Sequence, residues 1–463
     1  MKIMKKLHKY IGTAALAAIS LFACNPLQLD EIIDPNNPSV QSVSNNASRE
    51  QIQFLVTGLE SRHRDYVFNV TAAWGTFGRE VWYLNASDPR FQTDWLGQGG
   101  RVPDRAYFGF GVTGGGSWAS PFQAIKQADV LIASAQNAAT LSDAEKRAVA
   151  GFAKTIKGYQ FMIPANFVYQ NGIRIDISNP LNPGPFVTYE QALDHIKSVL
   201  DEGDQDLAAA GAGNFPLRLT PGFAGFNTNA ALRQVNRAIT ARLNAYRKDW
   251  TGVLSALEGS FMNLNGDLNA GPAHPYGAPP DQFNPIFYVP NALVTTMIVV
   301  HPSVLRDATP GDLRVTNKFL QRTAPPVTVT TDVGPLVGTH QDRRWATNTA
   351  AIPFIRNEEL ILLKAEAHAN LGQTAQAVEA INIIRNAAGI GDYSGATTQD
   401  ALINEILYQR RYSLWLEPWG HRWIDARRYN KLNEIDTSFD GGTVFTQFPH
   451  PQAEVNWDNY VGN

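Results

Sequence analysis

The stretch LLKAEAHANLGQTAQAVEAINIIRNAAGI, residues 362–390, contains two amphipathic segments separated by a glycine turn. Its apolar residues recur at spacings of three and four, which predicts two α-helices. A glycine after each segment predicts where each helix ends. With the preceding Leu360, the first face holds Leu363, Ala367 and Leu371 before Gly372, and the second holds Ala377, Ala380, Ile381 and Ile384 before Gly389.

Alanines at the predicted crossing allow the two helices to approach closely, so they form a tetratricopeptide-like pair. At least three such units are normally needed to build a continuous core. The same periodicity predicts helices upstream, and S/T-x-x-E/Q capping boxes begin two of them, at Ser142 and Thr188. We therefore expect a mainly α fold with tetratricopeptide-like pairs, including helices from Ser48 and over residues 118–138, 142–162, 188–209, 229–246 and 250–257.

Two segments lack this helical period. Residues 74–116 are dense in aromatic residues, Gly and Asp, and are expected to form a long loop of functional importance. Residues 261–353 are rich in Pro, Gly, Thr and Val and include the strand-like VTVTTDV at 327–333. We expect the second segment to be a loop-rich insertion that interrupts the helical array.

The N-terminus is typical of an exported lipoprotein. Four lysines precede an uncharged apolar run over residues 11–23, which is too short to span a bilayer. Residues 1–23 are therefore predicted to be a cleaved signal, and Cys24, the only cysteine, follows in a lipobox-like context and is predicted to carry the lipid. Residues 24–46 then form an extended leader, and residues 47–463 a single helical domain.

Charge excludes one class of ligand. Removing the signal takes away four lysines and no acids, so the formal charge changes from −3 to −7. Nucleic-acid binding depends on clustered Lys and Arg, which this acidic chain lacks. The low charged fraction of 17% and the ten tryptophans instead favour an uncharged ligand such as a sugar, although most of these rings must be core.

The block ALINEILYQRRYSLWLEPWGHRWIDARRYN, residues 401–430, concentrates charge near the C-terminus. Glu417, His421 and Asp425 are spaced i, i+4 and i+8, which a catalytic or zinc site could use. No second histidine is nearby and the surrounding arginines would repel a cation. We therefore expect Arg–carboxylate pairs that hold the terminal helix against its neighbours.

This block resembles the C-terminal signature of the SusD/RagB family, E-R-R-x-E-L-x-x-E-G-x-R-x-x-D-L-x-R. It departs from the pattern at Gln409, Ser413 and Ala426 and carries an apparent insertion of Pro418 and Trp419. The segment at 362–390 and the tail FPHPQAEVNWDN, residues 448–459, are similar to further family motifs. The matching signature positions are Arg410, Arg411, Leu414, Glu417, Gly420, Arg422, Asp425 and Arg428.

The resemblance implies a SusD-like helical fold with a loop-rich ligand-binding face and a non-enzymatic role. Members of the family are outer-membrane lipoproteins, exposed at the cell surface, that capture oligosaccharides or peptides for a SusC-like, TonB-dependent transporter. The implied partners are therefore this transporter, the ligand and the membrane through the lipid anchor. No cofactor is expected; calcium could bind in the Asp-rich loops, but no ligand spacing demands it.

Sugar rings pack on aromatic faces while carboxylates and amides bind their hydroxyls. The 74–116 segment offers this mixture, and the resemblance supports that region. A second supply lies in HPYGAPPDQFNPIFYVP, residues 274–290. The candidate ligand-binding residues are Trp82, Tyr83, Asn85, Asp88, Trp95, Tyr276, Phe283 and Tyr288.

Two other functions remain open from the residues alone. A lipid-anchored glycoside hydrolase would need a pair of carboxylates about 5–10 Å apart, which Glu80, Asp88, Asp94 or Asp104 could supply. A helical-repeat scaffold of the cell envelope would bind proteins and no small ligand. A dinucleotide site is disfavoured, because no buried strand is predicted before the G-x-G-x-x-G glycines Gly109, Gly111 and Gly114.

Overall fold

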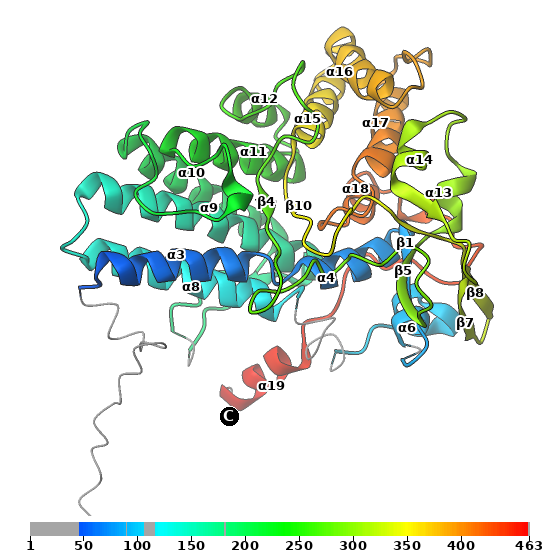
Figure 1. The fold of residues 1–463 in the computed structure, drawn as a ribbon, viewed down its shortest axis with the longest axis horizontal. Coiled ribbons are helices and arrows are strands. Elements are labelled where there is room, and N and C mark those ends of the chain that lie inside the picture. Colours follow the sequence, from blue (N-terminus) through cyan, green and yellow to red (C-terminus); the bar gives the residue numbers. More distant parts are fainter. Residues whose placement is uncertain (1–45, 89, 106–115, 180–181, 462–463) are drawn as a thin grey trace, which may run out of the picture.

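The computed structural model describes residues 46–88, 90–105, 116–179 and 182–461. The predicted lipidation site Cys24, the signal, almost all of the leader and Gly109, Gly111 and Gly114 lie outside these residues. Most of the described chain is helical (Figure 1). The principal helices are α3 (Arg49–His63), α8 (Ala119–Asn137), α9 (Asp143–Val168), α10 (Tyr189–Ala209), α11 (Asn229–Arg247), α12 (Trp250–Glu258), α15 (Asn357–Asn370), α16 (Thr374–Ala387), α17 (Gln399–Ser413), α18 (His421–Arg428) and α19 (Gln452–Val461).

The predicted helix boundaries are confirmed to within a few residues, except that α9 continues to Val168. Ser142 caps α9 and Thr188 caps α10 through capping boxes, as the sequence predicts. A third capping box, at Ser48, begins α3. Gly372 and Gly389 follow α15 and α16 with positive φ, the conformation that ends a helix at little cost to glycine.

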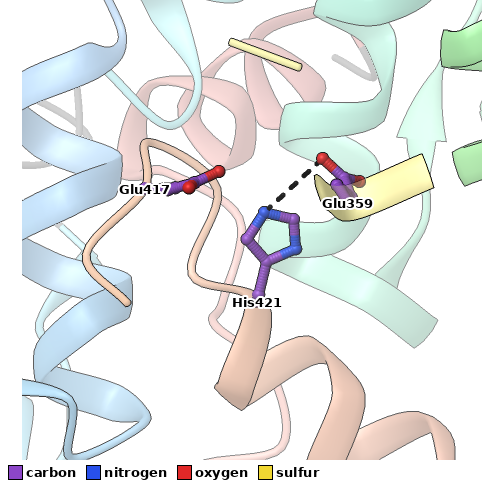
Figure 2. A group of neighbouring side chains, drawn as sticks. All are labelled: Glu359, Glu417 and His421. Atoms are coloured by element: carbon purple, nitrogen blue, oxygen red, sulfur yellow. Dashed lines mark ion pairs between the residues drawn. The ribbon is translucent and has the colours of Figure 1, made fainter. Parts of the chain in front are cut away.

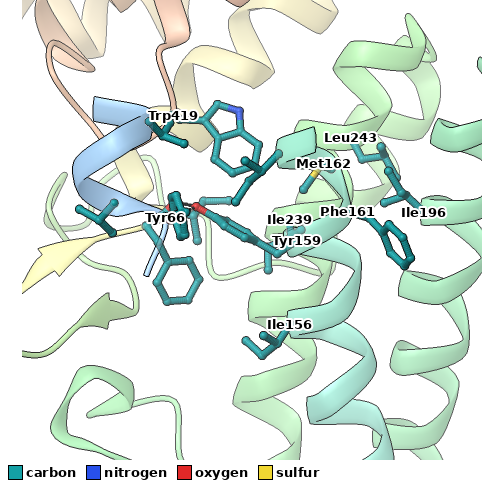
Figure 3. Packing of buried hydrophobic residues seen from close by; sticks show 14 of the residues in the cluster. Tyr66, Ile156, Tyr159, Phe161, Met162, Ile196, Ile239, Leu243 and Trp419 are labelled. Carbon is teal, nitrogen blue, oxygen red and sulfur yellow. Dashed lines mark hydrogen bonds between the residues drawn. The ribbon is translucent and has the colours of Figure 1, made fainter. Parts of the chain in front are cut away.

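Helices α9 and α10 approach each other closely at two glycines. A Cβ atom at Gly151 would lie 2.7 Å from the carbonyl oxygen of Gly203 and 2.6 Å from Cγ of Leu207. Only a residue without a side chain fits there. The large core contains Tyr66, Tyr159 and Trp419, whose rings are fully buried (Figure 3).

Helix α15 is buried on more than its predicted face. Leu360 and Leu363 pack into the large core with the N-terminal helices, whereas Ile361 and Leu362 pack into a second core with α16 and α17. The helix therefore lies between the two cores, and its hydrophobic residues surround it.

The insertion contains most of the strands, as expected. Its short helices are α13 (Pro302–Arg306) and α14 (Leu313–Lys318). The strands are β4 (Ala273–His274), β5 (Thr296–Val300), β6 (Phe319–Gln321), β7 (Val327–Thr331), β8 (Gly334–Gly338), β9 (His340–Asp342) and β10 (Ile352–Pro353), in addition to β2 (Ile173–Arg174) and β3 (Phe186–Val187) outside it.

The prediction that residues 74–116 form one loop is wrong for its first part. Residues Val81–Asn85 form strand β1, and Arg90–Leu96 form helix α6. Strand β1 pairs antiparallel with β5, from Val81 opposite Val300 to Asn85 opposite Thr296, in a four-stranded sheet of order β1-β5-β9-β6. Within the described residues, no helix combines the length and low polarity needed to cross a bilayer.

Candidate functional site

The aromatic rings predicted to bind sugar are mostly in the core. Trp82 is 3% exposed, Tyr83 7% and Trp95 fully buried. Side chains alternate across β1, so Trp82 and Leu84 pack under the β7–β8 hairpin while Tyr83 packs into the large core. Both faces of the strand are covered, and these three rings offer no open face to a ligand. Their assignment as ligand-binding residues is corrected accordingly.

Asn85, the last residue of β1, and Asp88, in the turn that follows, are half-buried. The Asn85 side-chain oxygen accepts a hydrogen bond from the backbone N–H of Ser87 at 2.9 Å, and Asp88 pairs with Arg90 at 2.8 Å. These polar groups therefore shape the turn. They stay candidate ligand contacts at the end of the sheet.

The second group of predicted residues does not form one site with the first. Tyr276 is 7% exposed, and this burial raises the pKa of its hydroxyl although the Arg64 guanidinium, 5.2 Å over the ring, acts to lower it. Tyr288 is half-buried and packs beside the β1–β5 region. Phe283 is 43% exposed and is the one ring of the predicted set with a large open surface. The structure thus contradicts a ligand role for the ring of Tyr276.

The charged block at the C-terminus forms the predicted Arg–carboxylate pairs. Asp425 accepts from Arg410 at 2.6 Å and from Arg428 at 2.7 Å, all three being nearly inaccessible to solvent. Arg411 pairs with Asp307 at 2.8 Å, and Glu417 pairs with Arg356 at 2.6 Å. These contacts join α17 to α18 and to the insertion, and join the segment before α18 to the start of α15.

Arg422, another charged position of the signature, interacts electrostatically with Arg411 and Glu80. Burial and the nearby Arg411 lower its pKa to about 9. Its positive charge acts on Glu80, whose pKa burial raises to about 8. Glu80 is only 1% exposed, so it is poorly placed to act on a substrate as a glycosidase carboxylate.

Glu359, Glu417 and His421 converge although Asp425 does not join them (Figure 2). Their candidate ligand atoms all lie within 4.8 Å of one another. Each carboxylate is already neutralised, since Arg242 binds Glu359 through two 2.6 Å contacts and Arg356 binds Glu417.

The tautomer of His421 also argues against a metal ion. Arg410 Nη2 lies 3.2 Å from His421 Nδ1, and because a guanidinium can only donate, Nδ1 must be the acceptor. Burial and Arg410 lower the pKa of His421 well below its usual value, so the ring is neutral and its proton is on Nε2. That nitrogen lies 4.0 Å from Glu359 Oε2, too far for a hydrogen bond, and because it carries the proton it has no lone pair for a metal.

Two adjoining cavities lie along α8, and the sequence did not indicate them. The first has a volume of about 510 Å³ and lies between the start of α8, the segment after β2 and helix α19. Its charged members are Arg174, Lys126 and Glu454. Its walls are otherwise mainly apolar and include Trp118, Phe122, Ile177, Pro183, Pro451 and Trp457.

The second cavity, of about 390 Å³, continues along the same helix. Lys126 and Ile177 line both cavities, so the two form one groove, named here the α8 groove. Its far end is lined by Asp129, Ala133, Lys157, Asp176 and Ser178. The aromatic rings lie at one end and the polar groups at the other.

Arg174 holds α19 in place at the aromatic end. Its guanidinium lies 4.0 Å over the ring of Phe186 and pairs with Glu454 at 3.2 Å and with Asp458. Glu454 also accepts a hydrogen bond from Trp118 Nε1 at 3.2 Å. Trp118 itself is 5% exposed, whereas Phe122 and Trp457 are half-buried and present more of their surface.

Part of the chain is similar to SusD-like proteins. The model of the SusD family matches residues 328–461. Over 100 residues the chain is 37% identical to the SusD-like protein P38 of Formosa agariphila, a match that spans 20% of either chain.

Solved structures match along most of the described chain. Surface glycan-binding protein A of Bacteroides thetaiotaomicron, solved with laminarihexaose, has a TM-score of 0.65 at 14% identity and covers 89% of this chain and 98% of its own. A SusD superfamily protein of Bacteroides vulgatus has a TM-score of 0.62 at 16% identity, covering 89% and 97%. At these identities the likeness establishes the SusD fold, which agrees with the mainly helical architecture predicted from the sequence.

Proposed function

We propose that this chain, whose residues 328–461 match the SusD family model and whose fold is that of SusD-like structures, captures oligosaccharides, or peptides, at the cell surface. It delivers them to a SusC-like, TonB-dependent transporter in the outer membrane. The observation that carries the proposal is the aromatic end of the α8 groove, because half-buried rings beside charged groups are the surface that sugar rings and their hydroxyls require.

The binding role is tested by calorimetric titration of the protein with a panel of soluble glycans and peptides. Trp457→Ala removes a half-buried ring of the groove and is expected to weaken binding about tenfold, which corresponds to ~1.4 kcal/mol. Phe54→Ala removes an exposed ring of α3, away from the groove, and serves as the matched control. Equal affinities for the wild type and Trp457→Ala would place the binding site outside the groove.

The transporter partnership is tested by co-purification from native outer membranes. A tagged protein is expected to bring down a TonB-dependent barrel in near-equal amount. Recovery of the protein without any barrel would contradict delivery to a transporter and favour the envelope-scaffold alternative.

Cys24 carries the acyl chains that anchor the protein. Stable anchoring requires more than one chain, because a single chain binds a membrane only marginally. Metabolic labelling with an alkyne fatty acid should mark the wild type and leave Cys24→Ser unmarked.

Turnover of any glycan that the protein binds would contradict the non-enzymatic part of the proposal.

A further inference from the structure

The shape of the α8 groove bears on what it binds. Phe122, Lys126 and Ala133 line it at intervals of four and seven residues along one side of α8, from the aromatic end to the polar end. At 1.5 Å per residue, the helix between Ala119 and Ala133 is about 20 Å long. A groove of this length accommodates a chain of several sugar units rather than one.

The charges in the groove balance. Three cations line it (Lys126, Lys157 and Arg174), together with three anions. Lys157 pairs with Asp129 at 2.6 Å, and Arg174 pairs with Glu454 at 3.2 Å.

The remaining two charged groups of the groove are Lys126 and Asp176. Asp176 accepts hydrogen bonds from the backbone N–H and the hydroxyl of Ser178, at 3.1 and 2.7 Å. Among the residues that the structure describes, neither Lys126 nor Asp176 forms an ion pair, so one cation and one anion of the groove are left for a ligand. A ligand with a negative charge on every unit would meet no excess of positive charge here, and the mature chain, at a formal −7, would repel it.

We infer that the α8 groove binds an uncharged saccharide chain along its length, with one unit packed against Phe122 and Trp457 and later units hydrogen-bonded near Lys157 and Asp129. This inference rests on the proposed function and narrows its ligand class. It excludes uronic-acid and sulfated glycans as the preferred ligands.

The test titrates the full mature protein with neutral oligosaccharides of two to eight units from several linkage series, and with oligogalacturonates of the same lengths. Affinity for the recognised neutral series should rise with length up to about four units and change little with salt. Tighter, salt-dependent binding of oligogalacturonates would overturn the uncharged ligand class.

The position of the saccharide chain is tested by blocking the polar end of the α8 groove. Ala133 is an exposed residue of α8 that lines the second cavity. Ala133→Trp should weaken binding of long chains about tenfold and leave disaccharide binding unchanged, whereas Gln136→Trp, on the same helix but outside the groove lining, should alter neither. Full affinity of Ala133→Trp for long chains would overturn lengthwise binding. No binding of any saccharide to the wild type would instead overturn the proposed glycan capture itself.

Discussion

Arg79 and Asp440, 361 positions apart, form an ion pair whose side chains have no solvent exposure. Two hydrogen bonds of 3.0 Å join the guanidinium to the carboxylate. Trp82 Nε1 lies 3.4 Å from the same carboxylate, and His301 Nε2 lies 3.5 Å from it. One aspartate thus binds the start of β1, the end of β5 and the C-terminal segment together.

Removing the charge of Asp440 should therefore destabilise the protein. Asp440→Asn leaves Arg79 buried without its counter-charge, and loss of one partner from a buried pair typically costs about 3–5 kcal/mol. Asp332→Asn is the matched control, because Asp332 is 78% exposed in its pair with Arg101 and should cost less than ~1 kcal/mol. Urea unfolding of both variants measures the difference; equal losses would contradict it.

The burial of Trp95 and the exposure of Phe283 predict opposite effects on stability. Trp95→Ala should cost about 3–5 kcal/mol of unfolding free energy, since it leaves a cavity in the core. Phe283→Ala should change stability by less than ~0.5 kcal/mol. Thermal unfolding followed by circular dichroism measures both. A stable Trp95→Ala variant would mean that this ring is not part of the core.

Two buried histidines predict loss of stability in acid. Burial lowers the pKa of His63 to about 3 and that of His274 well below its usual value, whereas unfolded histidine titrates near ~6.5. Below pH ~6.5 the unfolded chain takes up protons that the folded protein cannot, so stability falls as the pH falls. Each histidine contributes up to about 1.4 kcal/mol per pH unit.

A pair of variants isolates this effect. His274→Gln should reduce the loss of stability between pH 6.5 and 5.0 by about 2 kcal/mol. Glu60 has the opposite sign, because burial raises its pKa to about 7 and its contribution therefore grows as the pH falls from 7 towards ~4.5. Glu60→Gln should accordingly make the acid loss steeper. Urea unfolding at several pH values distinguishes the slopes, and an unchanged slope in His274→Gln would contradict the assignment.

The close approach of α9 and α10 predicts that Gly151 accepts no side chain. Gly151→Val would place carbons against the Gly203 carbonyl and Leu207, at a cost of about 1–3 kcal/mol. Ala144→Val introduces the same side chain on an exposed turn of α9 and should cost less than ~1 kcal/mol. Unfolding midpoints of the two variants provide the comparison. A Gly151→Val variant as stable as the control would show that the two helices can separate without loss.

The helices could be predicted because their signals are local. Ser142 and Glu145 cap α9 within four residues, and the apolar spacing of α16 appears in its own sequence. Strand β1 could not be predicted so readily, since its partner β5 lies more than 200 residues away. The run VWYL was itself a usable strand signal.

The site was harder to predict than the fold because aromatic residues are common both in protein cores and at ligand-binding surfaces. Trp82 and Trp95 are rings of the type that binds sugars, but Asp440 and the β7–β8 hairpin bury Trp82. Trp95 is buried in the large core against Phe77 and Phe91. The α8 groove shows the opposite case, in which residues that the sequence did not single out come together in a cavity. Phe122 and Trp457 lie more than 300 residues apart, and only tertiary packing brings them to one cavity.

The position of α15 between two cores has a consequence for cooperativity. Leu363 belongs to one core and Leu362, its neighbour, to the other. If either core melts, the helix loses the packing that keeps it folded, and the other core loses one of its walls. The two cores should therefore unfold together, in a single calorimetric transition whose van't Hoff enthalpy equals the calorimetric enthalpy.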